Sequence, residues 1–185
     1  MRLAQVLGAV AGAVGPRGTF AVIGAVARNA WAPPRATTDI DLTVVADPVL
    51  LKALGVSLGA LGYRPVREQR ADPAEALPDI VIYRCGEGEP RQVDILVAKT
   101  PFEDEVLRRA QPVEIGSVDV PIASPEDLIV YKLLADRPRD REDIRAVLRT
   151  QARAARPLDW PYVERWVSFW RIEDRLRRLR SDLGD

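Results

Sequence analysis

The sequence predicts an α/β (α+β) fold with a mixed sheet, followed by a helical region. Apolar runs of strand length alternate with amphipathic segments up to about residue 123. From Ser124 onward the periodic segments have the spacing of helices. We therefore expect an α/β core over residues 1–123 and a C-terminal helical region over residues 124–185 that packs on the core.

The expected elements of the core follow from short patterns. Gly15-Pro16 favours a helix over a signal peptide for the apolar segment before it, and Asp47-Pro48 is typical of a helix start. The polar, proline-containing stretch 64–78 is expected to be mostly loop. In order, we expect a helix over 2–14, a strand over 19–24, a helix near 26–30, a loop over 31–38, a strand over 39–46, a helix from 48 to about 59–62, strands over 79–85 and 92–97 joined by a hairpin turn over 86–90, a helix over 101–109 and an edge strand over 118–122.

The composition is that of an ordinary globular protein and excludes several classes. Apolar residues make up 47% of the 185 residues and charged residues 29%. No apolar run reaches the roughly 18 residues that cross a bilayer, so we expect no membrane partner. One cysteine excludes an internal disulfide, and cytoplasmic residence follows as the default. Because histidine is absent, carboxylates are the obvious ligands for a metal ion.

Two aspartates stand two residues apart at the start of the strand expected over 39–46. Side chains at i and i+2 of a strand point to the same face, so Asp39 and Asp41 share one small volume. Adjacent anions are unfavourable without a cation between them, and paired oxygen ligands suit Mg²⁺. Aspartates also begin ordinary strands, so the pair alone leaves both interpretations open.

Two further features favour the metal interpretation. Gly24 ends an apolar strand before a short helix, where a glycine lets the backbone approach a ligand and the helix N-terminus attracts phosphate. Asp94 is the only acid in the apolar strand 93–97, and a buried acid needs a partner or a metal ion. With Asp39 and Asp41, these residues predict a two-metal site for transfer at phosphorus.

These residues resemble the signature of the nucleotidyltransferase superfamily, the polymerase-beta-like fold. That signature joins Gly-Gly or Gly-Ser to Asp-hydrophobic-Asp, and it is matched here by Gly24-Ala25 and by Arg35-Ala36-Thr37-Thr38-Asp39-Ile40-Asp41-Leu42. The R-x-T-x-D-I-D-L form is most similar to the AbiEii-like nucleotidyltransferases and their toxin relatives. The resemblance runs from about residue 20 to residue 150. It implies a mixed-sheet nucleotidyltransferase core.

The resemblance also implies where the nucleotide binds. We expect its contacts to come from Gly24, Ala25, Arg28, Arg35 and Thr38. Ala25 departs from the relatives that carry serine, because alanine keeps the backbone N–H and loses the hydroxyl contact to phosphate. Relatives with Gly-Gly lack that hydroxyl too, so the departure does not exclude activity.

A second group of candidate residues lies downstream. Lys132 is the only charge on the apolar helix 128–135, and Asp140 falls on the apolar stripe of the next helix, with Asp143 at its edge. Lys132 and Asp140 are therefore expected to point at the same interior site. The alternatives are a helix-capping role for Asp140 and a snorkelling side chain for Lys132. The AbiEii-like family has a K…R-x-x-D arrangement, which Lys132, Arg137 and Asp140 match.

The C-terminal region carries an aromatic cluster and an excess of arginine. Residues 137–185 hold 13 basic and 9 acidic side chains, and the basic ones are all arginine. The aromatic residues Trp160, Tyr162, Trp166, Phe169 and Trp170 suit helix packing or base stacking. The arginines of the run 171–180 suit a solvated helix or a nucleic-acid backbone.

Taken together, the resemblance implies transfer of a nucleoside monophosphate from a nucleoside triphosphate, with release of pyrophosphate. Asp39, Asp41 and Asp94 would bind Mg²⁺, with Mn²⁺ as a substitute. Asp94 would complete the second metal site or accept the proton of the attacking hydroxyl. Lys132 would neutralise phosphate charge, and Asp140 would orient Lys132 or serve as a further acid.

The acceptor that the resemblance implies is RNA, including tRNA, or a protein. A toxin role would add a cognate antitoxin protein as a partner. Two alternatives stay open from the residues alone. One is a non-catalytic, nucleotidyltransferase-like binding module, and the other is a small-molecule adenylyltransferase acting on an antibiotic.

Overall fold

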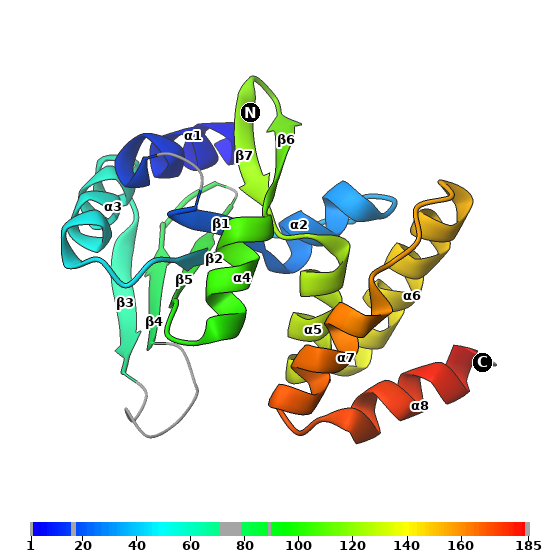
Figure 1. Ribbon diagram of the computed structural model, residues 1–185. Coiled ribbons are helices and arrows are strands. Elements are labelled where there is room, and N and C mark those ends of the chain that lie inside the picture. The colour runs from blue at the N-terminus through cyan, green and yellow to red at the C-terminus, as the bar shows by residue number, and fades with distance from the viewer. Residues whose placement is uncertain (1, 16–17, 71–78, 89, 184–185) are drawn as a thin grey trace. The chain divides into compact units, whose positions relative to one another are not determined.

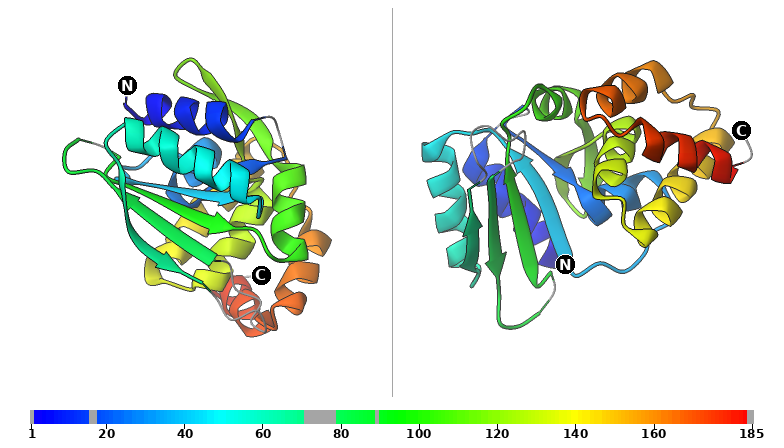
Figure 2. Two further views of the ribbon diagram at one scale, coloured as in Figure 1. Left: turned by 90° about the vertical axis from the view of Figure 1, so that its left-hand side faces the viewer. Right: turned by 90° about the horizontal axis from the view of Figure 1, so that it is seen from below.

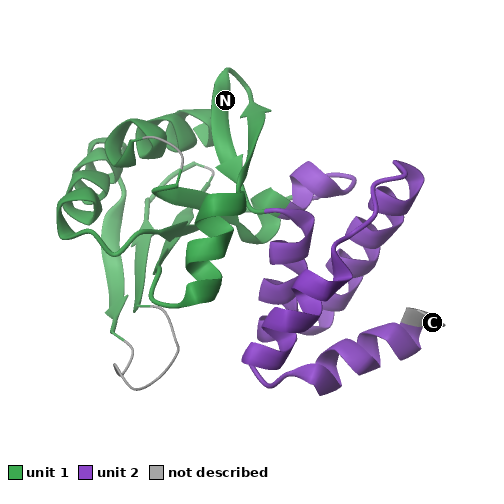
Figure 3. Cartoon of the chain, in the orientation of Figure 1, with its two compact units in different colours: residues 1–27, 36–123 green, residues 28–35, 124–185 purple. Residues whose placement is uncertain are grey.

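The computed structural model describes residues 2–15, 18–70, 79–88 and 90–183, and the chain forms two compact units (Figure 3). Unit 1 holds residues 1–27 and 36–123, and unit 2 holds residues 28–35 and 124–185. The division after residue 123 falls where the sequence pattern changes to helices. The inclusion of residues 28–35 in the helical unit has no signal in that pattern.

Unit 1 is built on a mixed sheet, which confirms the predicted fold class. Within the described residues the sheet has seven strands in the order β3-β4-β5-β2-β1-β7-β6 (Figure 1). β2 runs parallel to β5, β1 runs parallel to β7, and the other pairs are antiparallel. The strands are β1 (Phe20–Ile23), β2 (Asp39–Val44), β3 (Arg64–Gln69), β4 (Asp79–Arg84), β5 (Gln92–Val97), β6 (Gln111–Ile115) and β7 (Val118–Ile122).

Helices flank this sheet. α1 (Arg2–Val14) and α3 (Pro48–Ala60) pack against each other and lie side by side in Figure 2. α4 (Pro101–Arg109) contacts β1 and β2. α2 (Gly24–Trp31) follows β1 directly, and the boundary between the units falls inside it. As predicted, Asp47 caps α3: its side chain accepts hydrogen bonds from the first-turn N–H groups.

The two central strands fix which side chains face the core. Ile40, Leu42 and Val44 of β2 are fully buried. In β5, Val93 is fully buried and Ile95 is almost fully buried. Because side chains alternate along a strand, the residues between them share the opposite face. The apolar core therefore sets the direction in which the intervening acids of β2 and β5 point.

Several expectations about the sheet are wrong in detail. Residues 64–69 form strand β3 although they are expected to be loop, because β3 is an exposed edge strand without apolar alternation. Strand β6 is absent from the expectations, and it makes β7 an interior strand rather than an edge. β2 ends at Val44, two residues early. Pro16, residues 71–78 and Glu89, which carry parts of the expected helix stop, loop and hairpin turn, lie outside the described residues.

Unit 2 is helical, as expected from the sequence. Its helices are the end of α2, α5 (Pro125–Ala135), α6 (Pro138–Arg153), α7 (Trp160–Phe169) and α8 (Glu173–Leu183). A capping box between Ser124 and Asp127 starts α5, and the hydroxyl of Tyr162 from α7 donates to Asp127. Trp166 is buried, with ring centroids 6.2 Å from Tyr162 and 5.4 Å from Phe169. These contacts favour packing over base stacking for Tyr162, Trp166 and Phe169. None of the described helices has the length and apolar character to cross a membrane.

Candidate active site

The predicted acidic residues of unit 1 share one face of the sheet. β2 and β5 pair in parallel with Asp41 opposite Asp94 and Asp39 opposite Gln92. Paired residues project from the same side of a sheet, and neighbouring strands lie about 4.8 Å apart. The register therefore places Asp39, Asp41 and Asp94 on the face opposite the buried residues of these strands. The sequence alone supplies the i, i+2 pair, and the pairing of β2 with β5 supplies the third acid.

Gly24 lies directly against Asp41. β1 pairs with β2 so that Ile23 is opposite Asp41, and the chain turns at Gly24 into α2 with φ of 62°. A Cβ atom at Gly24 would lie 2.0 Å from Oδ2 of Asp41. Both the left-handed backbone and the space require glycine here. The next residue, Ala25, stands in the first turn of α2 and is partly exposed.

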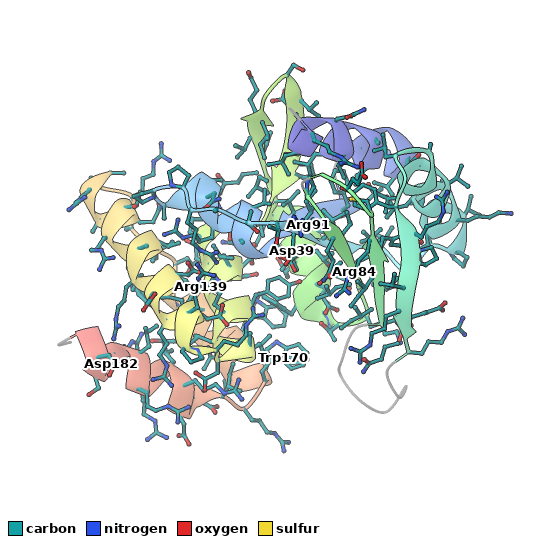
Figure 4. All side chains as sticks on the ribbon, turned by 180° about the vertical axis from the view of Figure 1, so that it is seen from behind. Asp39, Arg84, Arg91, Arg139, Trp170 and Asp182 are labelled. Atoms are coloured by element: carbon teal, nitrogen blue, oxygen red, sulfur yellow. The ribbon has the colours of Figure 1, made fainter. Side chains whose placement is uncertain are left out.

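Asp94 is tied to its neighbours by a short polar chain. Gln92 Nε2 donates to Asp94 Oδ1 at 2.8 Å and to Oδ2 at 3.0 Å, while Arg84 Nε donates to Gln92 Oε1 at 2.8 Å. Burial raises the pKa of Asp94 above its ordinary value, and the negative charge of Asp39 raises it further. The Gln92 hydrogen bond and the charge of Arg84 oppose this shift. Figure 4 labels Asp39 and Arg84 on the sheet.

The side chains of the acids do not close around a common point. Within the described ranges, three or more carboxylate or thiol groups nowhere gather closely enough to hold a metal ion. Thr38 Oγ1 donates to Asp39 Oδ1 at 3.1 Å, and both oxygens of Asp94 accept from Gln92. The donor set nevertheless fits a divalent cation, because three carboxylates share one face and the pKa of Asp94 is raised by burial and by the neighbouring charge of Asp39.

The downstream candidates form a second cluster inside unit 2. Lys132 of α5 is 5% exposed, and its Nζ donates to Asp140 Oδ1 at 2.9 Å and to Asp143 Oδ2 at 2.7 Å. Lys132 and Asp140 thus meet as the helix faces predict. Asp140 also accepts from the backbone N–H of Arg137 at 3.2 Å and from its Nε at 2.8 Å. Asp140 therefore caps α6 and pairs with Lys132 at once.

Arg28 and Arg35 belong to this second cluster. The sequence predicts nucleotide contacts for both, but in unit 2 both approach Asp143. Arg35 Nε and Nη2 donate to the two oxygens of Asp143 at 3.0 and 2.9 Å, a bidentate pair. Arg28 Nε lies 3.1 Å from Asp143 Oδ1 but makes no hydrogen bond there, so this contact is an ion pair without directed donation. Arg28 Nη1 instead donates to the carbonyl of Pro33.

Charge balance explains the ionisation of this cluster. Burial raises the pKa of Asp143, but the hydrogen bonds and charges of Arg35 and Lys132 outweigh it and hold the pKa at about 2. For Asp140, burial is likewise outweighed by Arg137 and Lys132, and the pKa is lowered. The same attraction raises the pKa of Arg35. Both carboxylates are therefore anions that neutralise Lys132.

Two residues at the centre of these clusters are missing from the predicted set. Gln92 could have been found from its i, i+2 relation to Asp94, which places both on one strand face. Asp143 lies one helical turn after Asp140, so the two can share a face. The bidentate partner of Asp143 comes from 108 residues earlier in the chain, and no local pattern signals that pairing.

The sheet order, the glycine turn and the acids of β2 and β5 define the class of fold. The structure is similar to the antibiotic-resistance factor ANT(2'')-Ia, with a TM-score of 0.57 and 18% identity over 99% of this chain and 97% of that one. A crystal structure of ANT(2'')-Ia in complex with adenylyl-2''-tobramycin also gives a TM-score of 0.57, with 19% identity over 92% and 98% of the two chains. The crystal structure of a candidate nucleotidyltransferase from Thermotoga maritima gives a TM-score of 0.53, with 14% identity over 80% of this chain and 91% of that one. The fold is therefore nucleotidyltransferase-like.

The family follows from the sequence match. The chain belongs to the nucleotidyltransferases of unknown function designated DUF6036, whose family model matches residues 20–178. A search of the curated proteins finds no match. The matched range includes both the acidic face of unit 1 and the ionic cluster of unit 2.

Proposed function

We propose that this protein is a metal-dependent nucleotidyltransferase that transfers a nucleoside monophosphate from a nucleoside triphosphate to an acceptor hydroxyl. The observation that supports this most is the register of β1, β2 and β5. It places Asp41 opposite Asp94, sets Gly24 against Asp41 and keeps Asp39 on the same face. Carboxylates beside a glycine turn at a helix N-terminus suit a triphosphate and its cation.

In this proposal Asp39 and Asp41 hold Mg²⁺ or Mn²⁺, and Asp94 is the third ligand. The cation supplies neutralisation of phosphate charge and orientation of the triphosphate. The N–H groups at Gly24 and Ala25 bind phosphate oxygens at the start of α2. Alternatively, Asp94, whose pKa is raised by burial and by Asp39, would accept the proton of the acceptor hydroxyl. Asp94 takes either role only after its oxygens leave the amide of Gln92.

The second cluster has a positioning role in this proposal. Lys132 is neutralised by two carboxylates within unit 2, so we assign it to holding α5 against α6 rather than to contacting phosphate. Asp140 orients Lys132, and Asp143 holds Arg35. Arg35 lies four residues before Asp39 in the chain, so the pair fixes the segment that leads into β2.

The acceptor and the cellular role extend the proposal. We propose RNA, tRNA included, or a protein as the acceptor, with membership of the AbiEii-like branch, a toxin role in a toxin–antitoxin pair and cytoplasmic residence. The R-x-T-x-D-I-D-L form of residues 35–42 supports that branch. Antibiotic adenylylation is the second candidate, because the fold is similar to that of ANT(2'')-Ia.

Label transfer tests the proposal. Each α-³²P nucleoside triphosphate is incubated with the protein and Mg²⁺ or Mn²⁺, and label is followed onto cell RNA, the protein itself, an added protein mixture and aminoglycosides. We expect transfer to RNA or protein, with Asp41→Asn reducing it to background. Transfer to aminoglycosides alone would establish the second candidate. Nucleotide binding without transfer in any reaction would instead establish a binding module.

A further inference from the structure

The arginines of α8 are largely occupied within unit 2. Arg175 Nη1 donates to the carbonyls of Leu133 and Leu134 at 2.8 and 2.6 Å, at the C-terminal end of α5. Three others pair with acids: Arg177 with Asp174, Arg178 with Asp136 and Arg180 with Glu164. The excess of arginine in this helix therefore satisfies local acids and helix ends rather than presenting open positive charge.

The last turns of α6 differ from α8. Arg149 and Arg153 stand four residues apart on one face of this helix, and Arg156 follows the helix end. All three are exposed, and within the described part of the chain none forms an ion pair or hydrogen bond through its side chain. Glu142 projects in nearly the same direction as Arg149 but two turns earlier. We call Arg149, Arg153 and Arg156 the basic face of α6.

A pocket of about 400 Å³ opens at this basic face. Its lining includes Arg149, Gln151, Arg156 and Trp160, together with Leu148 and Leu158. The backbone builds it by turning sharply after α6: Arg156 N–H donates to Gln151 O at 3.0 Å, and Ala155 adopts the left-handed conformation with φ of 50°. A nucleobase fits a pocket of this size, which lies within the range of small-ligand sites.

Gln151 supplies an amide group to this pocket. The residue is only 6% exposed and lines the pocket, and its amide is not one of the fully buried polar groups that lack a partner. The amide offers both a donor and an acceptor. A bound molecule with donor and acceptor groups on one edge would pair with it. A base edge has such groups.

We propose that the basic face of α6 and its pocket bind single-stranded nucleic acid. One unpaired base enters the pocket beside Trp160 and hydrogen-bonds to Gln151, while Arg149, Arg153 and Arg156 contact the phosphodiester backbone. Aromatic platforms combined with a basic surface are the usual means of binding single strands. A polycationic aminoglycoside would be repelled by the same three charges. The inference deepens the proposed function, on which it rests only in treating the bound strand as the acceptor.

Fluorescence anisotropy of a short labelled RNA, without nucleoside triphosphate and over a range of salt, measures this binding directly. The double variant Arg149→Ser with Arg156→Ser is compared with Arg108→Ser with Arg177→Ser, which removes two exposed, locally paired arginines elsewhere. We expect the first pair to weaken binding about tenfold and to reduce the slope of log Kd against log salt by about 1.4. The control pair should change either value far less. Equal weakening by both pairs would overturn the proposal.

The pocket itself is tested by Gln151→Leu, which keeps the side-chain volume and removes the amide. We expect weaker RNA binding, because the base loses its hydrogen bonds to the amide. Unchanged affinity would show that no base enters the pocket and would overturn that part of the proposal. A DNA strand of the same sequence should bind through the same residues.

The two proposals fail separately. Asp41→Asn should lose label transfer while binding the labelled RNA as the wild type does. An RNA that does not bind the wild type would overturn this inference, whereas label transfer to another acceptor would leave the proposed function standing. If the protein binds RNA but transfers no label under any condition, the proposed function is overturned and the RNA-binding inference stands.

Discussion

At the scale of single residues, Gly24 is the most constrained position of the candidate site. Its φ of 62° is a conformation that other residues rarely adopt, and its α-carbon stands where a Cβ would overlap Asp41. The close approach sets the start of α2 against the side chain of Asp41. In the proposed function the glycine therefore serves the site rather than the sheet.

Substitution of Gly24 by alanine tests whether the proposed site requires glycine at this position. The left-handed backbone would cost about 1 kcal/mol of stability, and the added methyl group would displace Asp41. Because a misplacement of about 1 Å can lower rates roughly a hundredfold, we expect transfer to fall by that order, measured as initial rates of label transfer. Gly12→Ala is the matched control. It lies in α1 with no atom within 4 Å of the added Cβ, and alanine there should raise stability by roughly 0.5–1 kcal/mol.

The ionisation of Asp94 makes a second prediction at this scale. The pKa of this carboxyl is raised by burial and by Asp39, and Gln92 opposes that shift. Transfer should therefore be lost on acidification at a higher pH than an ordinary aspartate would give. Gln92→Leu removes the opposing hydrogen bond, so the acid limb of the pH–rate profile should move to still higher pH. An acid limb that stays in place, or moves to lower pH, would count against a catalytic role for ionised Asp94.

The sequence predicts the residues whose relation is local and misses those whose relation depends on pairing. The spacing of Asp39 and Asp41 and the turn at Gly24 need only the geometry of one strand and one turn. Gln92 joins the site through the register of β5 with β2, and Asp143 through a partner far away in the chain. Arg28 and Arg35 are predicted to contact the nucleotide, and their ion pairs with Asp143 have no local signal in the sequence.

At the scale of elements, the ends of the helices show how local chemistry sets boundaries. Caps at Asp47, Thr100 and Ser124 begin α3, α4 and α5, and two of these starts are visible in the sequence. Strands were predicted well where they are buried, as in β1 and β5, and missed at the sheet edges. β3 and β6 are mostly exposed, so their formation depends on hydrogen bonding to β4 and β7 rather than on apolar alternation.

The end of α6 offers a test at the element scale. Ala155 has φ of 50°, and the N–H of Arg156 donates to the carbonyl of Gln151. The left-handed position of such a turn is usually occupied by glycine. Ala155→Gly should therefore raise the free energy of unfolding by about 1 kcal/mol, measured by denaturant titration. Ala152→Gly, three residues earlier within the helix, should lower it by a similar amount. A loss of stability in both variants would contradict the left-handed turn.

At the scale of the whole molecule, unit 2 draws on two separate stretches of chain. Arg28 and Arg35 from one stretch approach Asp143 from the other, and Lys132 completes the charge balance. The sequence pattern changes to helices near residue 123 but does not mark residues 28–35, because a short proline-containing segment gives no sign of which unit it joins.

Acid stability reports on this ionic cluster. The pKa of Asp143 is lowered from its ordinary 3.8 to about 2, so its stabilising effect is complete above about pH 4 and is lost as the pH falls toward 2. This amounts to about 2 kcal/mol. Asp143→Asn should remove that acid dependence and destabilise the protein by about 3 kcal/mol at neutral pH, because buried cations lose their partner. Asp174→Asn, an exposed paired acid, should change the acid profile little in denaturant titrations at each pH.

The interleaved course of the chain through its two units has a consequence for how such a protein is made and diversified. During synthesis, residues 28–35 leave the ribosome long before Asp143 exists, so the helical unit waits for the whole sheet to be translated. A recombination event that exchanged only residues 124–185 would deliver helices whose buried aspartate must be matched by the arginines of another parent. Inheritance of these helices is therefore linked to residues 28–35, which are encoded upstream of most strands of the sheet.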